Sequence, residues 1–159
     1  YYLICCLDLV KTFQSSLAIK GNQSRLLLPL ASECVSAGFP SPADDYIDAG
    51  IDLNEHLIRN PASTFFLRVS GNSMTGAGIY NDDLLVVDRS IDPHPGQIVV
   101  AVIEGAFILK RLVLKNEVLY LEADHPDYQQ IDLRQYENVH VWGVAIHSIH
   151  SLNSIKKSK

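Results

Sequence analysis

The feature that most constrains this chain is a series of six short apolar runs after residue 62, separated by turn signals. Each run is rich in β-branched or aromatic residues, and they lie at residues 63–70, 83–88, 97–103, 106–114, 117–123 and 138–149. Short runs of this kind joined by short links are typical of antiparallel sheets. Glu104-Gly105 and Lys115-Asn116 are expected to form tight hairpin turns. The sequence therefore predicts a mostly β, compact domain, built as an antiparallel barrel or sandwich.

The region before these runs has a different pattern. Pro40 and Pro42 hold the neighbouring backbone extended and disfavour a helix before them, so the segment around them is expected to be an exposed arm. Between residues 46 and 60 the apolar residues recur near helical spacing, and Asn60-Pro61 follows. This stretch predicts a short helix, or a strand followed by one.

Composition excludes several classes of protein. A chain of 159 residues has room for one domain with a real core, and it contains no apolar run long enough to span a membrane. The net charge is −5, which argues against direct binding of duplex DNA. Cys5, Cys6 and Cys34 form no CxxC pair, which predicts a reducing compartment and neither a disulfide framework nor a zinc site.

Ser73, in the stretch SGNSM at residues 70–74, raises the question of catalysis. A serine beside glycine is usually a turn residue. No GxSxG motif is present, and none of the histidines lies in a recognisable triad setting. At a period of two, His147 faces away from both His140 and His150, so the three are not expected to bind a metal together. Asp82-Asp83 is interpreted as a turn.

A lysine is the other candidate base. In the run 106–114, Lys110 and Arg111 point to opposite faces, and both faces carry mainly apolar residues. Arginine stays protonated in proteins, whereas burial lowers the pKa of a lysine because the ammonium loses its hydration. A neutral Lys110 amine could take the proton of Ser73 Oγ. The alternative is an ordinary strand lysine whose ammonium reaches water.

Three segments in register decide which family the chain resembles. They are AGFPSPADDYIDAGIDLN at residues 37–54, SGNSM at residues 70–74 and FILKRL at residues 107–112, with Lys110 standing 37 positions after Ser73. Together they resemble the LexA/UmuD family of self-cleaving serine peptidases, and most closely its UmuD-like members. The resemblance runs from Leu28 to His150.

The resemblance implies a set of site residues. Ser73 falls on the family's nucleophile and Lys110 on its general base. The backbone N–H groups of Asn72 and Ser73 fall on its oxyanion hole. The chain would cleave itself between Ala37 and Gly38, and neither a cofactor nor a metal is implied. Residues 1–37 would then be an arm removed by self-cleavage and residues 38–159 the peptidase domain; residues 1–27 do not match the expected arm, and their origin stays open.

The resemblance also implies a role in the cell. It predicts a cytoplasmic, homodimeric protein of the SOS response to DNA damage, whose cleavage is stimulated by RecA filaments on single-stranded DNA. The cleaved product would serve as a subunit of an error-prone translesion polymerase, with a UmuC-like Y-family polymerase as partner. The acidic composition of the chain agrees with an indirect contact to DNA, through partner proteins.

Three other interpretations were weighed. The chain could be the C-terminal self-cleavage domain of a LexA- or phage-type repressor, with an operator-binding domain ahead of it, but the GFPSP segment favours the UmuD-like members. Residues 25–37 faintly resemble a signal peptide, but Glu33 interrupts the pattern. A non-enzymatic module with a decayed dyad is disfavoured because both Ser73 and Lys110 are present.

Overall fold

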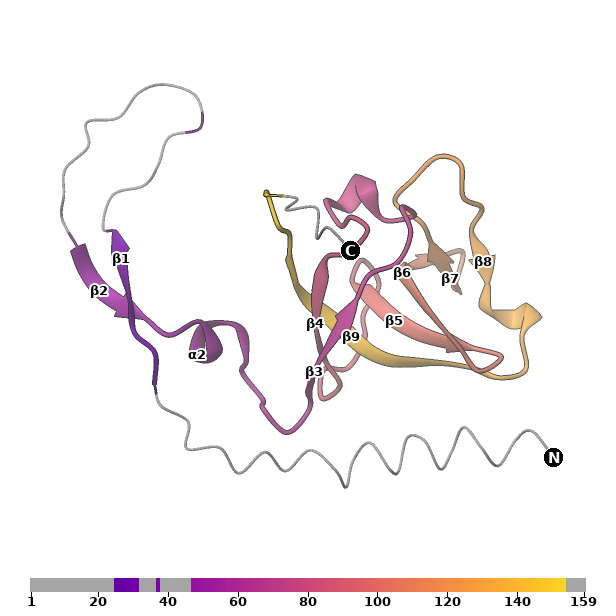
Figure 1. Cartoon of the computed structure of the whole chain (residues 1–159). Coiled ribbons are helices and arrows are strands. Elements are labelled where there is room, and N and C mark those ends of the chain that lie inside the picture. Colours follow the sequence, from indigo (N-terminus) through magenta and orange to yellow (C-terminus); the bar gives the residue numbers. More distant parts are fainter. Residues whose placement is uncertain (1–24, 32–36, 38–46, 154–159) are drawn as a thin grey trace, which may run out of the picture. The chain divides into compact units, whose positions relative to one another are not determined.

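The computed structural model of the protein describes residues 25–31, 37 and 47–153 (Figure 1). The described residues belong to two compact units that divide between Ile58 and Arg59. The first unit supplies the segment before the sheet domain, and the second unit is the sheet domain itself.

The first unit contains a strand pair and one turn of helix. Strands β1 (Leu28–Ala31) and β2 (Ile47–Ile51) pair antiparallel, and helix α2 (Leu53–Leu57) follows. The carboxylate of Asp52 caps the helix by accepting a hydrogen bond from the backbone N–H of Asn54 at 2.9 Å. Of the two forms predicted for this stretch, the strand followed by a helix is therefore confirmed.

The second unit is an antiparallel sheet of seven strands in the order β3-β4-β9-β5-β6-β7-β8 (Figure 1). The strands are β3 (Thr64–Arg68), β4 (Leu84–Asp88), β5 (Ile98–Ile103), β6 (Ala106–Lys115), β7 (Val118–Glu122), β8 (Ile131–Asp132) and β9 (Val139–Ile149). Two single 3₁₀ turns are present as well: η1 (Thr75–Ala77) follows β3, and η2 (Leu133–Gln135) follows β8. The six predicted runs all form strands; β8 was missed because two residues are too few to show a period.

One hairpin prediction is confirmed and the other is shifted. Glu104 and Gly105, with φ of 47° and 82°, form the turn between β5 and β6 as expected. The next turn is formed by Asn116 and Glu117, with φ of 49° and 63°, and not by Lys115-Asn116. The reason is that β6 continues through Lys115, which pairs with Val118, so the left-handed positions fall one residue later.

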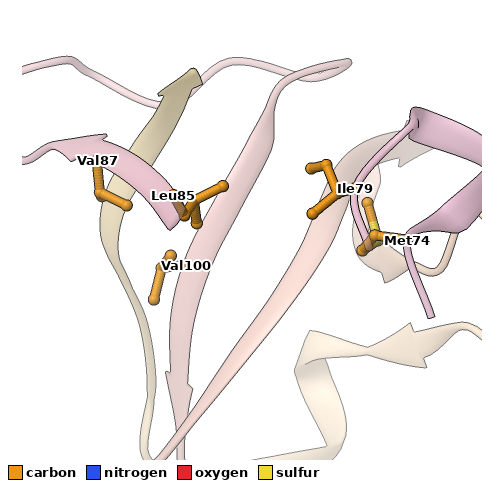
Figure 2. Close-up of a cluster of buried hydrophobic side chains, with 5 residues drawn as sticks. All are labelled: Met74, Ile79, Leu85, Val87 and Val100. Carbon is orange, nitrogen blue, oxygen red and sulfur yellow. The ribbon is translucent and has the colours of Figure 1, made fainter. Parts of the chain in front are cut away.

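Both faces of the sheet carry a buried core. One cluster contains Met74, Ile79, Leu85, Val87 and Val100. The other contains Val99, Ala101, Leu112, Leu121 and Val144. Neighbouring residues such as Val99 and Val100 belong to different clusters because successive side chains of a strand point to opposite faces. Figure 2 shows that Met74 and Ile79 come from the segment after β3, whereas the other three members of the first cluster come from strands β4 and β5.

The sheet is curled. Strands β4, β9 and β5 separate β3 from β6 in the order of the sheet, yet the residues that follow β3 and the first half of β6 line one cleft. An edge strand can approach a strand four places away only if the sheet bends back on itself. This confirms the predicted mostly β, antiparallel and barrel-like fold, and it brings distant segments together at the cleft.

Candidate active site

Ser73 lies on a loop that is closed on itself. At its base, the N–H of Val69 donates to the carbonyl of Asp83 and the N–H of Asp82 donates to the carbonyl of Val69, each at 2.9 Å. Higher in the loop, the N–H of Gly71 donates to the side-chain oxygen of Asn81 at 2.9 Å. Ser73 therefore stands on a corner whose backbone is held from both sides.

The residue after Ser73 anchors this corner to the core. Met74 is only 2% exposed and packs in the same cluster as Ile79 and Leu85 (Figure 2). Its carbonyl accepts hydrogen bonds from the N–H groups of Ala77 and Ile79, which closes the turn η1. Because a buried methionine and a hydrogen-bonded turn follow Ser73 directly, its Cα has little freedom to move.

Lys110 meets Ser73 inside the cleft. Its Nζ donates a hydrogen bond to Ser73 Oγ at 2.6 Å, although the two residues stand 37 positions apart. Lys110 lies in the middle of β6 and is only 6% exposed, so its ammonium is not in water as the alternative interpretation required. The structure thus pairs the two residues that the sequence analysis singled out.

The surroundings of Lys110 favour its neutral form. Burial lowers the pKa of Lys110, because the ammonium loses hydration that the protein does not replace. The ring of Tyr128 lies 5.5 Å from Nζ and is the one aromatic face near it among the described residues. A neutral lysine amine beside a serine hydroxyl can accept the hydroxyl proton, which is the chemistry of a nucleophile activated by a general base.

The cleft beside the pair is lined by both polar and apolar groups. It has a volume of about 130 Å³ and is bordered by residues 69–71 on one side and residues 107–110 on the other. A second cavity of about 280 Å³ continues from it and shares Val69, Ser70, Phe107, Ile108 and Leu109. The two together form a groove that ends at Ser73 and Lys110.

A strand edge borders this groove. Among the described strands, β7 pairs only with residues 111–115 of β6, so residues 106–110 have a backbone edge without a partner strand. Strand β3 stands at one end of the sheet order and therefore has an edge without a partner as well. Such edges can accept an extended peptide through main-chain hydrogen bonds.

The other predicted site residues are the oxyanion-hole N–H groups and the residues of the cleavage site. Within the described part of the chain, the backbone N–H groups of Asn72 and Ser73 donate to no protein group. Ala37 is exposed. Gly38 and the cysteines Cys5, Cys6 and Cys34 lie outside the described residues.

Arg111 also has a partner. It forms an ion pair with Asp124, in the loop after β7, and the side chains are 33% and 21% exposed respectively. A charged residue on a largely apolar strand needs such a partner. The sequence indicated that a partner must exist, but nothing in it singled out Asp124.

The histidines do not form a metal site. His140 and His147 are exposed, and the ring of His150 lies 2.6 Å from the carboxylate of Asp83. Strand β9 has register shifts opposite both β5 and β4, but the two shifts compensate, so His140 and His147 still point to opposite faces as predicted. Over the ranges that the structure describes, no group of three His, Cys, Asp or Glu could hold a metal ion.

Asp83, predicted as part of a turn, is buried at 2% exposure and accepts hydrogen bonds from Ser148 Oγ and from the N–H of Tyr80. With His150 as a further partner, its oxygens are occupied by protein groups.

No helix in the described ranges is long and apolar enough to cross a membrane.

Comparison with known proteins identifies the family. Residues 29–146 match the model of the peptidase S24-like family. The chain is 45% identical over 129 residues to protein ImpA of Salmonella typhimurium, covering 80% of this chain and 87% of that protein. It is 42% identical over 142 residues to protein MucA of Escherichia coli, covering 88% and 93%. It is 38% identical over 121 residues to the LexA repressor of Pasteurella multocida, covering 75% and 56%.

The chain belongs to the peptidase S24-like family of self-cleaving serine peptidases, and its relatives place it among the UmuD-like members. This confirms the predicted family, the predicted enzyme class and the predicted role in SOS mutagenesis. The match to ImpA and MucA extends over nearly the whole of those proteins, whereas the match to the LexA repressor extends over about half of it. The UmuD-like interpretation is therefore favoured over the repressor.

Proposed function

We propose that this UmuD-like peptidase cleaves its own chain between Ala37 and Gly38, with Ser73 as nucleophile and Lys110 as general base. The observation that carries the proposal is the 2.6 Å contact between Lys110 Nζ and Ser73 Oγ at the end of the groove. The buried position of Lys110 supports a neutral amine, which a base needs.

The reaction runs in two halves. Neutral Lys110 takes the proton of Ser73 Oγ as that oxygen attacks the carbonyl carbon of Ala37. The negative charge that develops on the carbonyl oxygen is met by the N–H groups of Asn72 and Ser73, which donate to no other described group. The C–N bond then breaks, Lys110 returns its proton to the amide nitrogen of Gly38, and Ala37 is left as an ester of Ser73. A water molecule, deprotonated by Lys110, hydrolyses this ester and frees Ser73.

The arm around Ala37 suits such a reaction. Pro40 and Pro42 favour an extended backbone, and the groove is bordered by strand edges that bind extended peptides. Because the scissile bond and the nucleophile belong to one chain, the effective concentration of the substrate is high. The rate is then controlled by how often the arm occupies the groove. Residues 1–37 are the removed arm and residues 38–159 are the peptidase domain in this scheme.

The partners follow from the UmuD-like assignment. In the cytoplasm, a RecA filament on single-stranded DNA stimulates the cleavage, and the product joins a UmuC-like Y-family polymerase for translesion synthesis. The protein acts as a homodimer. One feature that supports dimerisation is the end of β9, where residues 145–149 pair only with β4 among the described strands and leave an edge that a second copy could cover.

The first test is the intact mass of the purified protein after incubation at pH 7 and pH 10, alone and with RecA, single-stranded DNA and a nucleotide. We expect fragments that end at Ala37 and begin at Gly38. Ser73→Ala and Lys110→Ala should each lower the cleavage rate by roughly 10⁴-fold or more, because the pair acts as a unit. Ser151→Ala and Lys115→Met serve as matched controls, since both side chains are exposed and lie outside the residues that line the cleft.

Cleavage that persists in either dyad variant would overturn the assignment of the site. Cleavage at another bond, with the dyad variants inactive, would leave the dyad in place and overturn the assignment of Ala37-Gly38.

A further inference from the structure

The loop between β7 and β8 is attached to β6 by a charged contact next to Lys110. Arg111, which follows Lys110 in β6, donates from Nε to both carboxylate oxygens of Asp124 at 3.1 Å, and its Nη2 forms an ion pair with the same carboxylate. A further guanidinium nitrogen of Arg111 donates to the carbonyl of Gly96 at 2.6 Å. A fork of this kind fixes the direction of the carboxylate as well as its distance. Asp124 is therefore held in one place relative to the strand that carries Lys110.

The main chain of Asp124 is attached to the loop that carries Ser73. Its carbonyl oxygen accepts a hydrogen bond from the N–H of Gly76 at 2.7 Å. A Cβ added at Gly76 would lie 2.5 Å from that oxygen, so only glycine allows this approach. Gly76 stands three positions after Ser73 within the turn η1. Asp124 therefore joins the nucleophile's corner to β6 by a route separate from the Ser73–Lys110 contact.

We infer that Arg111 is a positioning residue for self-cleavage, which holds the Ser73 corner against Lys110 through Asp124 and Gly76. This inference rests on the proposed roles of Ser73 and Lys110. In the sheet order, the strand before the corner and β6 are separated by three strands, so sheet pairing alone does not set the distance between Oγ and Nζ. The Arg111–Asp124–Gly76 contact sets it locally. The same loop carries Tyr128, whose ring lies over Lys110 Nζ.

A neighbouring ion pair provides a matched control. Lys115 and Glu122 form an ion pair between β6 and β7, close to the Arg111–Asp124 pair in the sequence. Among the described residues, neither has a hydrogen-bonded or ionic contact with the Ser73 loop, and the Lys115 side chain is 49% exposed. Removing this pair disturbs the same hairpin without touching the nucleophile's corner.

The experiment measures the self-cleavage rate from pH 6 to pH 11 in the full chain and in Asp124→Ala, Gly76→Ala and Arg111→Lys, with Lys115→Ala as control. Asp124→Ala and Gly76→Ala should lower the plateau rate by roughly 100-fold, since a misplacement of about 1 Å costs this much. They should also move the midpoint of the pH profile upward, because a loosened corner lets water reach Lys110 and its pKa returns toward that of a free lysine. Arg111→Lys keeps the charge but loses the fork, and an intermediate rate is expected.

The midpoint of the pH profile distinguishes a positioning role from a general loss of folded protein. A loss of folded protein would lower the rate at every pH and leave the midpoint unchanged. Circular dichroism and Tm show which variants are folded. If Gly76→Ala or Asp124→Ala does not fold, the milder Arg111→Lys decides. Folded variants with the wild-type plateau and midpoint would overturn the inference while the dyad stands. A wild-type chain that does not cleave, or a Ser73→Ala chain that does, would instead show that the proposed function has failed.

Discussion

The end of β4 and the middle of β6 both bury an ionisable side chain, but they treat it in opposite ways. Asp88, in β4, is 1% exposed and accepts hydrogen bonds from Asn60, Ser63 and Ser90. Burial alone would raise the pKa of Asp88, but the hydrogen bonds from Ser90, Asn60 and Ser63 outweigh it and hold the pKa well below its usual range. Its charge is permanent at any pH at which the protein works.

Lys110 has no such set of partners. Among the described residues, the only hydrogen bond of its Nζ is to Ser73 Oγ, and burial lowers its pKa. Burial alone therefore does not determine whether a side chain is charged, because hydrogen bonds to the charged form can offset it. The carboxylate of Asp88 is surrounded by hydrogen-bond donors, whereas Lys110, the proposed general base, has few polar partners.

The largest effect is expected from Lys110→Arg, which places a cation that cannot lose its proton at the position of the proposed base. We expect the cleavage rate to fall by roughly 10⁴-fold or more, as for removal of a member of a catalytic pair. The rate is measured by the intact mass of the protein over time, with Lys115→Arg as the control for the same substitution at an exposed site of the same strand. An active Lys110→Arg protein would mean that the residue acts through its charge and not as a base.

The second effect concerns stability. Asp88→Ala removes the shared acceptor of Asn60, Ser63 and Ser90. Because Asn60 and Ser90 are exposed and can turn to water, we expect the free energy of unfolding to fall by about 2 kcal/mol. Urea denaturation at pH 7 measures this loss. Asp92→Ala, at an exposed position after the same strand, is the control.

The pH dependence of this contribution follows from its sign. Because the pKa of Asp88 is lower in the folded chain, its stabilisation is fully present above the unfolded pKa of 3.8 and is lost as pH falls toward the folded pKa. The difference between wild type and Asp88→Ala should therefore shrink below pH 4. A difference that is constant from pH 7 to pH 2 would contradict the role of the ionised carboxylate.

The smallest effect is expected for a change of one pH unit, which alters the cleavage rate of the unmodified chain. If Lys110 must be neutral, the rate rises by about tenfold per pH unit below its folded pKa and levels off above it. Because burial lowers that pKa, the plateau should begin below the pKa of 10.5 of an ordinary lysine. Spontaneous cleavage of the purified chain between pH 6 and pH 11 measures it, and a flat profile would rule out a lysine base.

The residues of the proposed site could be predicted in part from their chemistry, and the family resemblance then implied their roles. A lysine and an arginine side by side on an apolar strand require partners, and a serine in a stretch with glycine and asparagine indicates a turn. What the pattern did not predict was the partner of Arg111. Asp124 lies in an irregular loop, where no periodic pattern distinguishes it from the other acidic residues. The close approach at Gly76 is a property of three segments that meet only in the folded chain.

The amino-acid sequence alone was enough to predict six of the seven strands of the sheet, the short helix before them and the family that the chain resembles. These depend on local spacing, which a linear pattern carries. Tertiary structure decided the turn at Asn116-Glu117, the register shifts of β9 and the 2.6 Å contact between Ser73 and Lys110. The turn depends on how far β6 and β7 pair, and the register shifts and the contact depend on how strands far apart in the chain pair and curl. The energy that selects them comes from packing and hydrogen bonding between segments, and no local stretch records it.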